Sequence, residues 1–263
     1  MKCKMIFSSH ISHLSSTVSH LPSHISHFIF FTMKIISITT SHRICGCAIA
    51  DDERILGEMD FAADRRCVEE LTGRIEALLR ECGAQPEDLD GVAADVGPGM
   101  LTGLKIGVVT AKTYAQVLNL PVAGISSFQV LAAGAPSDYM NISVVIHSSR
   151  DQYFYAMFCR RGEILEETVR GRIVNASDVV RSLVSGDEAI YVTGGGVEKL
   201  REELRAGHLV LAGKADCFPR AKDLSRVALG MFRLGQGTRY DNINPLYICA
   251  TNAEKNLAGK GIK

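Results

Sequence analysis

The chain has 263 residues, of which 46% are hydrophobic and 22% charged, a composition typical of a globular protein rather than a disordered one. Its formal net charge is zero, so no overall basic field favours binding to nucleic acid or to a membrane surface. No apolar stretch approaches the roughly 20 residues that a membrane-spanning helix needs, and we expect a cytoplasmic protein. The length is sufficient for two lobes with a core each.

Residues 1–32 differ in composition from the rest of the chain. They hold five of the eight histidines among many serines, with few charges and no sustained helical or strand period. His20, His24 and His27 have the spacing of neighbours on a helix, but a proline interrupts the run, and no metal site is predicted there. We expect a disordered extension or a start codon assigned too far upstream, with the folded chain beginning at Met33.

The first half of the folded chain reads as three strands, a helix and a fourth strand. The strands are expected over residues 34–39, 44–50 and 54–60, the helix over 64–82 and the next strand over 92–96. The apolar stripe of this helix consists of Val68, Leu71, Ile75, Leu78 and Leu79. Strands followed by alternating helices and strands predict an α/β lobe of the ribonuclease-H-like type.

A glycine-rich turn follows the fourth strand. Gly97 and Gly99 flank a proline, and Thr102 has the hydroxyl expected of an N-cap for a helix that runs from about Gly103 to Leu118. A strand, a tight turn and a helix start can bind an anion through free N–H groups and the helix dipole. The turn matches neither the Walker nor the dinucleotide motif, so an ordinary tight turn is the alternative.

The second half repeats this order of elements. Its expected elements are strands at 142–147, 152–159 and 163–170, a helix at 177–184, a strand at 189–193, a helix up to about residue 205 and a helix at 224–234. The repetition predicts two similar lobes, residues 33–136 and residues 137–263, the second including the C-terminal helix and tail.

Residues 97–127 read GPGMLTGLKIGVVTAKTYAQVLNLPVAGISS. This text resembles the signature of the bacterial TsaB (YeaZ) family, in which GPGSFTGLRIG-type text precedes a helix and a P-V-x-G-V-S-S strand. A thinner likeness extends from Met33 to the segment Asn244-Pro245-Leu246-Tyr247. The resemblance implies an actin-like (ASKHA) fold and a non-catalytic paralogue of TsaD, acting in the complex that forms N6-threonylcarbamoyladenosine next to the tRNA anticodon.

The resemblance also implies partners. These are a TsaD-like subunit, a TsaE-like ATPase and a threonylcarbamoyl-adenylate synthase, with tRNA contacted only through the complex and a homodimer left open. In such relatives the first two helices dock on the same helices of TsaD or of a second copy, so we expect a partner interface made of Val68, Leu71, Ile75, Leu79, Ile106 and Val109. No cofactor of its own is implied, and ATP or ADP at the interface of the complex is left open.

The chain departs from the family pattern at two places where chemistry would need charge or metal ligands. Relatives carry I-D-T-S in the first strand, whereas this chain has Thr39 in place of the aspartate. TsaD has a metal-binding His-x-x-x-His on the following helix, where this chain has Cys67 and Leu71. Threonine cannot replace the charge of a carboxylate, so we predict no catalytic residue and no metal site.

An alternative function is that of a nucleotide-binding, actin-like ATPase or kinase-like protein acting alone. Gly97, Gly99, Thr102 and Gly103 would contact the nucleotide, and Asp95 is the carboxylate that could still position a metal.

The remaining motifs also favour structural roles. Gly194–Gly196 could approach an adenosine, but a tight turn explains it, and His147 lacks a neighbouring nucleophile or carboxylate. A peptidase, a third alternative, is not indicated because no Gly-x-Ser-x-Gly motif or cysteine–histidine pairing occurs. Cys45 and Cys47 read as buried hydrophobes in a strand.

Overall fold

The structure is a computed structural model that describes residues 32–52, 54–62 and 67–248. Residues 1–31 of the expected extension, which was residues 1–32, lie outside the described part of the chain. Among the described residues, no helix combines the length and the apolar character needed to cross a membrane.

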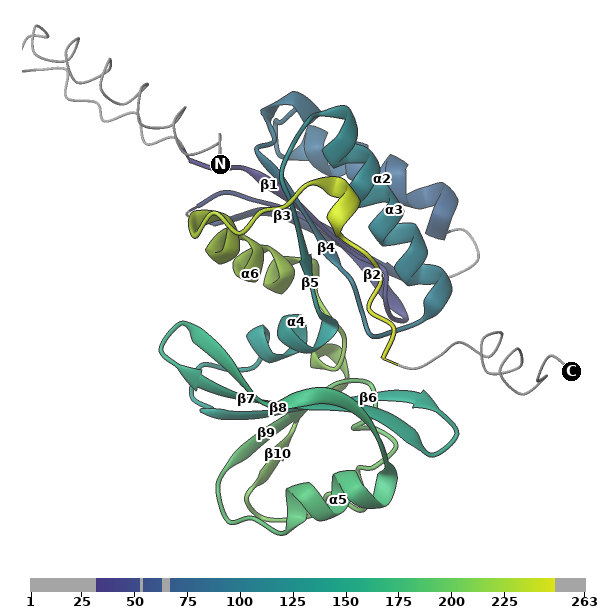
Figure 1. The fold of residues 1–263 in the computed structure, drawn as a ribbon, viewed down its shortest axis with the longest axis vertical. Helices are drawn as coiled ribbons and strands as arrows, with labels where there is room; N and C mark the ends of the chain where they lie inside the picture. The colour runs from purple at the N-terminus through teal and green to yellow at the C-terminus, as the bar shows by residue number, and fades with distance from the viewer. Residues whose placement is uncertain (1–31, 53, 63–66, 249–263) are drawn as a thin grey trace, which may run out of the picture. The chain divides into compact units, whose positions relative to one another are not determined.

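Two five-stranded sheets with the same strand order form the framework (Figure 1). The first sheet contains β1 (Ile35–Thr39), β2 (Ile44–Ala50), β3 (Ile55–Ala62), β4 (Gly91–Asp95) and β5 (Val122–Ile125). The second contains β6 (Asn141–Ser149), β7 (Gln152–Arg161), β8 (Ile164–Asn175), β9 (Ile190–Thr193) and β10 (Leu209–Leu211).

The strand orders are β3-β2-β1-β4-β5 and β8-β7-β6-β9-β10. In each sheet the first three strands form an antiparallel meander, and the last two add in parallel beside the first strand. The same topology therefore occurs twice, which confirms the expected α/β architecture of two similar actin-like lobes.

Helices cover both faces of the first sheet. α2 (Cys67–Glu81) and α3 (Leu101–Val117) pack on one face, where Ile75 and Val108 share a core with β1, β2 and β4. α6 (Ala221–Arg233) packs on the opposite face through Leu224. The expected boundary of the second lobe was therefore wrong for α6, because the chain returns from the second sheet to cover the first, which no local pattern reveals.

The second sheet lies between two shorter helices (Figure 1). α4 (Ser127–Ala133) contributes Phe128 to its core, and α5 (Ala176–Val184) contributes Val179 and Leu183. Short 3-10 helices occur at Pro86–Asp88, Lys214–Asp216 and Tyr240–Asn242.

The expected helix after the Gly194–Gly196 turn is absent, and a series of turns takes its place. Gly194 has a φ of +104°, and any side chain there would overlap the carbonyl oxygen of Val145 in β6. The same oxygen accepts a hydrogen bond from the Gly196 N–H at 2.8 Å. This close approach holds the segment against the sheet and prevents a regular helix from starting. Strand β10 was not predicted from the sequence, because it has only three residues.

Candidate functional site

The carboxylate of Asp95 lies at the end of β4 and is 1% exposed. It accepts hydrogen bonds from the hydroxyls of Thr39 (2.9 Å), Ser41 and Ser127 (2.6 Å) and from the Gly97 N–H (2.9 Å). Four donors, from the end of β1 and its turn, the turn after β4 and the start of α4, thus satisfy both carboxylate oxygens. A buried carboxylate with these partners ties the segments together and has few lone pairs left for a metal ion or its water.

His42 extends this network towards the second half of the chain. Its Nδ1 lies 2.6 Å from Ser41 Oγ, and because the Ser41 proton is directed to Asp95, we assign Nδ1–H as the donor. His42 is 7% exposed, and its ring lies edge-on to the ring of Phe218, with the two ring centroids 6.4 Å apart. Its Nε2 has no hydrogen-bond partner among the described residues. Burial lowers the pKa of His42, against the opposing effect of Asp95, so the imidazole is neutral near pH 7.

The lowered pKa of His42 predicts a pH-dependent stability. A histidine whose pKa is lower in the folded than in the unfolded state stabilises the fold above pH 6.5, and this contribution is lost as the pH falls below that value. Below that pH we expect the free energy of unfolding of the wild type to decrease more steeply than that of His42→Gln. The difference between the two slopes is up to about 1.4 kcal/mol per pH unit. Urea unfolding of both proteins between pH 7.5 and 5.5 measures the difference; parallel curves would contradict the assignment.

The turn between β1 and β2 lies directly on the start of α3. A side chain at Gly99 would overlap the carbonyl oxygen of Ser41, and one at Gly103 would overlap that of Thr40. Thr40 Oγ1 donates to Gly103 O at 2.7 Å, and the Met100 N–H donates to Ser41 O at 2.7 Å. Glycines at these positions therefore allow two backbone segments to touch.

This contact changes the prediction for the anion site. α3 begins at Leu101 with Met100 as its N-cap, so the prediction of Thr102 as N-cap was wrong. The Ser41 carbonyl accepts the hydrogen bond of the Met100 N–H, so this donor is not free to bind an anion. The carbonyls of the β1–β2 turn lie where an anion would need donors. Nucleotide binding at Gly97, Gly99, Thr102 and Gly103 stays a prediction, and the packing over Gly99 and Gly103 does not favour it.

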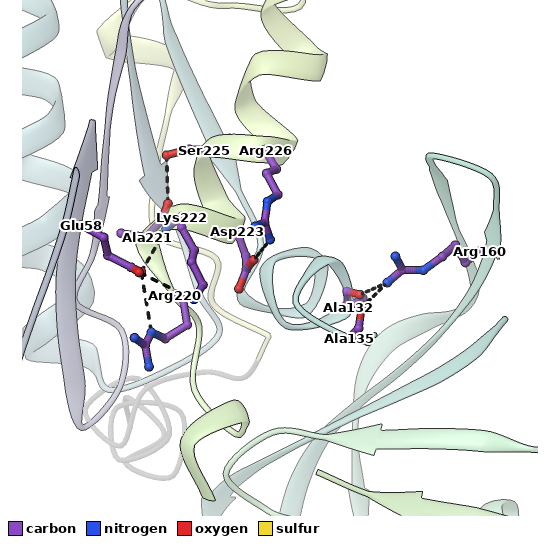
Figure 2. Close-up of polar contacts among 10 residues, drawn as sticks. All are labelled: Glu58, Ala132, Ala135, Arg160, Arg220, Ala221, Lys222, Asp223, Ser225 and Arg226. Carbon is purple, nitrogen blue, oxygen red and sulfur yellow. Dashed lines mark hydrogen bonds and ion pairs between the residues drawn. The ribbon is translucent and has the colours of Figure 1, made fainter. Parts of the chain in front are cut away.

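A second feature is a polar cavity of about 260 Å³ between α4 and the start of α6. Its charged lining includes Arg220, Lys222 and Arg226, a set that could bind an anion. However, Arg220 and Lys222 each pair with Glu58 at 3.7 Å, and Arg226 pairs with Asp223 at 2.5 Å (Figure 2). Because these cations are already paired with carboxylates, the cavity gives little support for an anion site.

His147, Cys45 and Cys47, which the sequence analysis also considered, make contacts that favour structural roles. His147 lies near the end of β6, with its Nε2 3.1 Å from Arg150 O and 3.0 Å from Lys199 Nζ. Cys45 and Cys47 are buried in the core beneath α2, and burial raises the pKa of Cys47 to about 12. Within the described residues, no three His, Cys, Asp or Glu side chains gather closely enough to hold a metal ion.

On α2, the structure contradicts most of the predicted partner interface. Leu71, Ile75 and Leu79 are at most 2% exposed and pack into the core of the first sheet. They hold α2 on the sheet and are not available to a partner, because one broad apolar stripe is fully used within the chain. The side chain of Val68 lies outside the described part of the structure.

On α3, the predicted interface residues differ from each other. Ile106 is half-buried and packs against the core, whereas Val109 is 60% exposed. Leu101 and Val117, which the sequence did not single out, are 40% and 76% exposed on the same helix. Among the side chains that the structure describes on these two helices, the large exposed apolar ones therefore lie on α3.

Comparisons with known proteins agree with this architecture. The family model of TsaD, the tRNA N6-adenosine threonylcarbamoyltransferase, matches residues 61–226. The tRNA threonylcarbamoyladenosine biosynthesis protein TsaB of Bacillus subtilis is 28% identical over 62% of this chain and 71% of its own length. The protein of the same name from Escherichia coli is 25% identical over 87% of this chain and 100% of its own length.

A solved structure, YeaZ from Pseudomonas aeruginosa, superposes with a TM-score of 0.73 at 21% identity and covers 82% of this chain and 99% of its own. At this level of identity the likeness shows the fold. The family model and the two TsaB relatives lead to one conclusion: the chain belongs to the TsaD family and is a TsaB (YeaZ) member of it.

Proposed function

We propose that this chain takes part in the biosynthesis of tRNA threonylcarbamoyladenosine as a non-catalytic adaptor. It binds a TsaD-like subunit and supports the transfer of the threonylcarbamoyl group to the adenosine beside the anticodon. A TsaE-like ATPase and a threonylcarbamoyl-adenylate synthase complete the system, and tRNA is contacted through the complex. The names of the TsaB relatives support the pathway, and the geometry of the first lobe supports the adaptor role.

The apolar surface of α3 is the observation that carries the adaptor role. Leu101, Val109 and Val117 lie along α3 and are each at least 40% exposed. The eight-residue spacing turns each of them by about 80° from the one before, so Val109 lies between the other two around the helix. Several large apolar side chains exposed along one helix are a feature that an interface with a partner would cover. The neighbouring helix α2 presents exposed polar residues, Glu76 and Arg80, as the rim of an interface would.

The buried network around Asp95 supports the non-catalytic part of the proposal. A carboxylate that accepts four hydrogen bonds and is almost fully buried serves packing better than metal binding. With Thr39 in the first strand donating to it, the lobe has a hydroxyl where relatives have an acid. The transfer chemistry is therefore assigned to the TsaD-like partner.

Val109→Glu tests the interface. A charge in the centre of an apolar contact has to be desolvated, so we expect the affinity for the TsaD-like subunit to fall by about 100-fold or more. The side chain is 60% exposed, so the melting temperature should change by less than about 2 °C. Isothermal titration calorimetry with the purified subunit measures the affinity.

The matched control is Ile164→Glu, an equally apolar position that is 70% exposed on the β7–β8 hairpin. It should bind as the wild type does. Unchanged affinity in Val109→Glu would remove α3 from the interface, and an equal loss in both variants would show that the effect is not local.

A further inference from the structure

The short helix α4 contributes side chains to the cores of both sheets. Phe128, Leu131 and Ala132 are buried in the core of the second sheet. Val130 is buried in the cluster between the first sheet and α6. A seven-residue helix is marginal by itself, so these tertiary contacts are what hold it in place.

The N-terminal end of α4 is bound to the first lobe. Ser127 Oγ donates to Asp95 Oδ1 at 2.6 Å, and the Ser127 N–H donates to Gly97 O at 2.7 Å. Both contacts are buried and involve residues at the carboxyl end of β4. The negative charge of Asp95 also lies on the favourable side of the helix dipole.

The C-terminal end of α4 is bound to the second lobe. Arg160 in β7 donates from Nη2 to Ala132 O at 3.0 Å and to Ala135 O at 2.8 Å (Figure 2). A positive charge at this end again complements the helix dipole, and the guanidinium adds a donor to the two carbonyls that end this turn. Each end of α4 is thus held by a charged residue from a different lobe.

Close backbone packing restricts sliding of α4 between these two ends. A side chain at Gly171 in β8 would overlap the ring of Phe128. A side chain at Gly134, just after the helix, would come within 2.8 Å of Asp223 Oδ2 in α6. Interfaces this tight favour one arrangement over a continuous range of arrangements.

We propose that α4 is a rigid strut that joins the two lobes into one cooperative unit. Its fixed ends are the Ser127–Asp95 contact in the first lobe and the contacts of Arg160 with Ala132 and Ala135 in the second. The two lobes therefore keep one relative orientation without a ligand between them. This inference rests on the fold and stands apart from the adaptor function.

Arg160→Met tests the strut in the full chain, because it keeps the apolar part of the side chain and removes the donors. Hydrogen exchange read by mass spectrometry, along a thermal ramp, follows each lobe separately. We expect the wild type to lose protection in both lobes at one midpoint. In the variant, exchange over residues 127–133 should rise about tenfold or more at 25 °C. The midpoints of the lobes should also separate by about 3–10 °C.

Arg161→Met is the matched control, because this neighbouring arginine is exposed and makes a surface ion pair with Glu166 at 3.5 Å. It should behave as the wild type does. If Arg160→Met fails to fold, Ser127→Ala, which removes the hydroxyl that contacts Asp95 and Ser41 at the other end, gives the same readout. Separate midpoints in the wild type, or a single midpoint with unchanged exchange in α4 of the folded variant, would overturn the proposal.

Discussion

Replacement of Asp95 by alanine is expected to cost about 3–5 kcal/mol of the free energy of unfolding, a large part of what a domain of this size has. The substitution leaves the hydroxyls of Thr39, Ser41 and Ser127 and the Gly97 N–H without their acceptor. All of these groups lie in the buried interior, where an unpaired donor keeps its full desolvation cost.

Urea unfolding followed by circular dichroism measures this loss, and Asp138→Ala, at an exposed position, is the control, with an expected change within about 0.5 kcal/mol. Asp95→Ala also distinguishes the adaptor function from the alternative of a nucleotide-binding protein that acts alone. If Asp95→Ala keeps the stability of the wild type but loses binding of ATP or ADP, Asp95 is a ligand-binding residue, and a nucleotide-dependent activity of the chain itself becomes the better account.

Gly103→Ala is expected to destabilise the fold by about 3 kcal/mol, which is at the upper end of what one added methyl group does. The methyl group would overlap the Thr40 carbonyl, so the β1–β2 turn must move and the hydrogen bond from Thr40 Oγ1 to Gly103 O is strained. A backbone atom cannot rotate away as a flexible side chain can, and this makes the penalty large.

Gly73→Ala in α2 is the matched control for this prediction. Gly73 also lies within a helix, but a side chain there meets nothing within 4 Å. Alanine should therefore stabilise the fold by about 0.5–1 kcal/mol through helix propensity. Changes of opposite sign in the melting temperatures of the two variants would support the close contact of the turn with α3. An unchanged melting temperature in Gly103→Ala would contradict it.

Most of the fold could be predicted from the sequence, because local patterns determine most of its elements. Strand β2 agrees with its expected bounds, and the repeated order of elements predicted the two similar lobes. The errors occur where tertiary contacts decide. The return of α6 to the first sheet depends on chain crossing, and the turns after Gly194 depend on the approach to Val145.

The candidate site was less predictable than the fold. The glycines at 99 and 103 stood out in the sequence, but the pattern could not show that the β1–β2 turn occupies the space above them. Asp95 was singled out, whereas its partners Ser127 and Ser41 were not, although Ser127 ends the motif that carried the family resemblance. Arg160 had no local signal, because its two carbonyl partners lie more than twenty residues earlier in the chain.

The central claim is that the chain is required for the modification but does not perform it, and a leave-one-out reconstitution tests this most directly. The full chain is added to, or omitted from, the matching TsaD-like and TsaE-like subunits and the synthase, with ATP, threonine, bicarbonate and tRNA. We expect N6-threonylcarbamoyladenosine to form only when the chain and the TsaD-like subunit are both present. Equal formation without the chain, or formation by the chain without the TsaD-like subunit, would contradict the adaptor role.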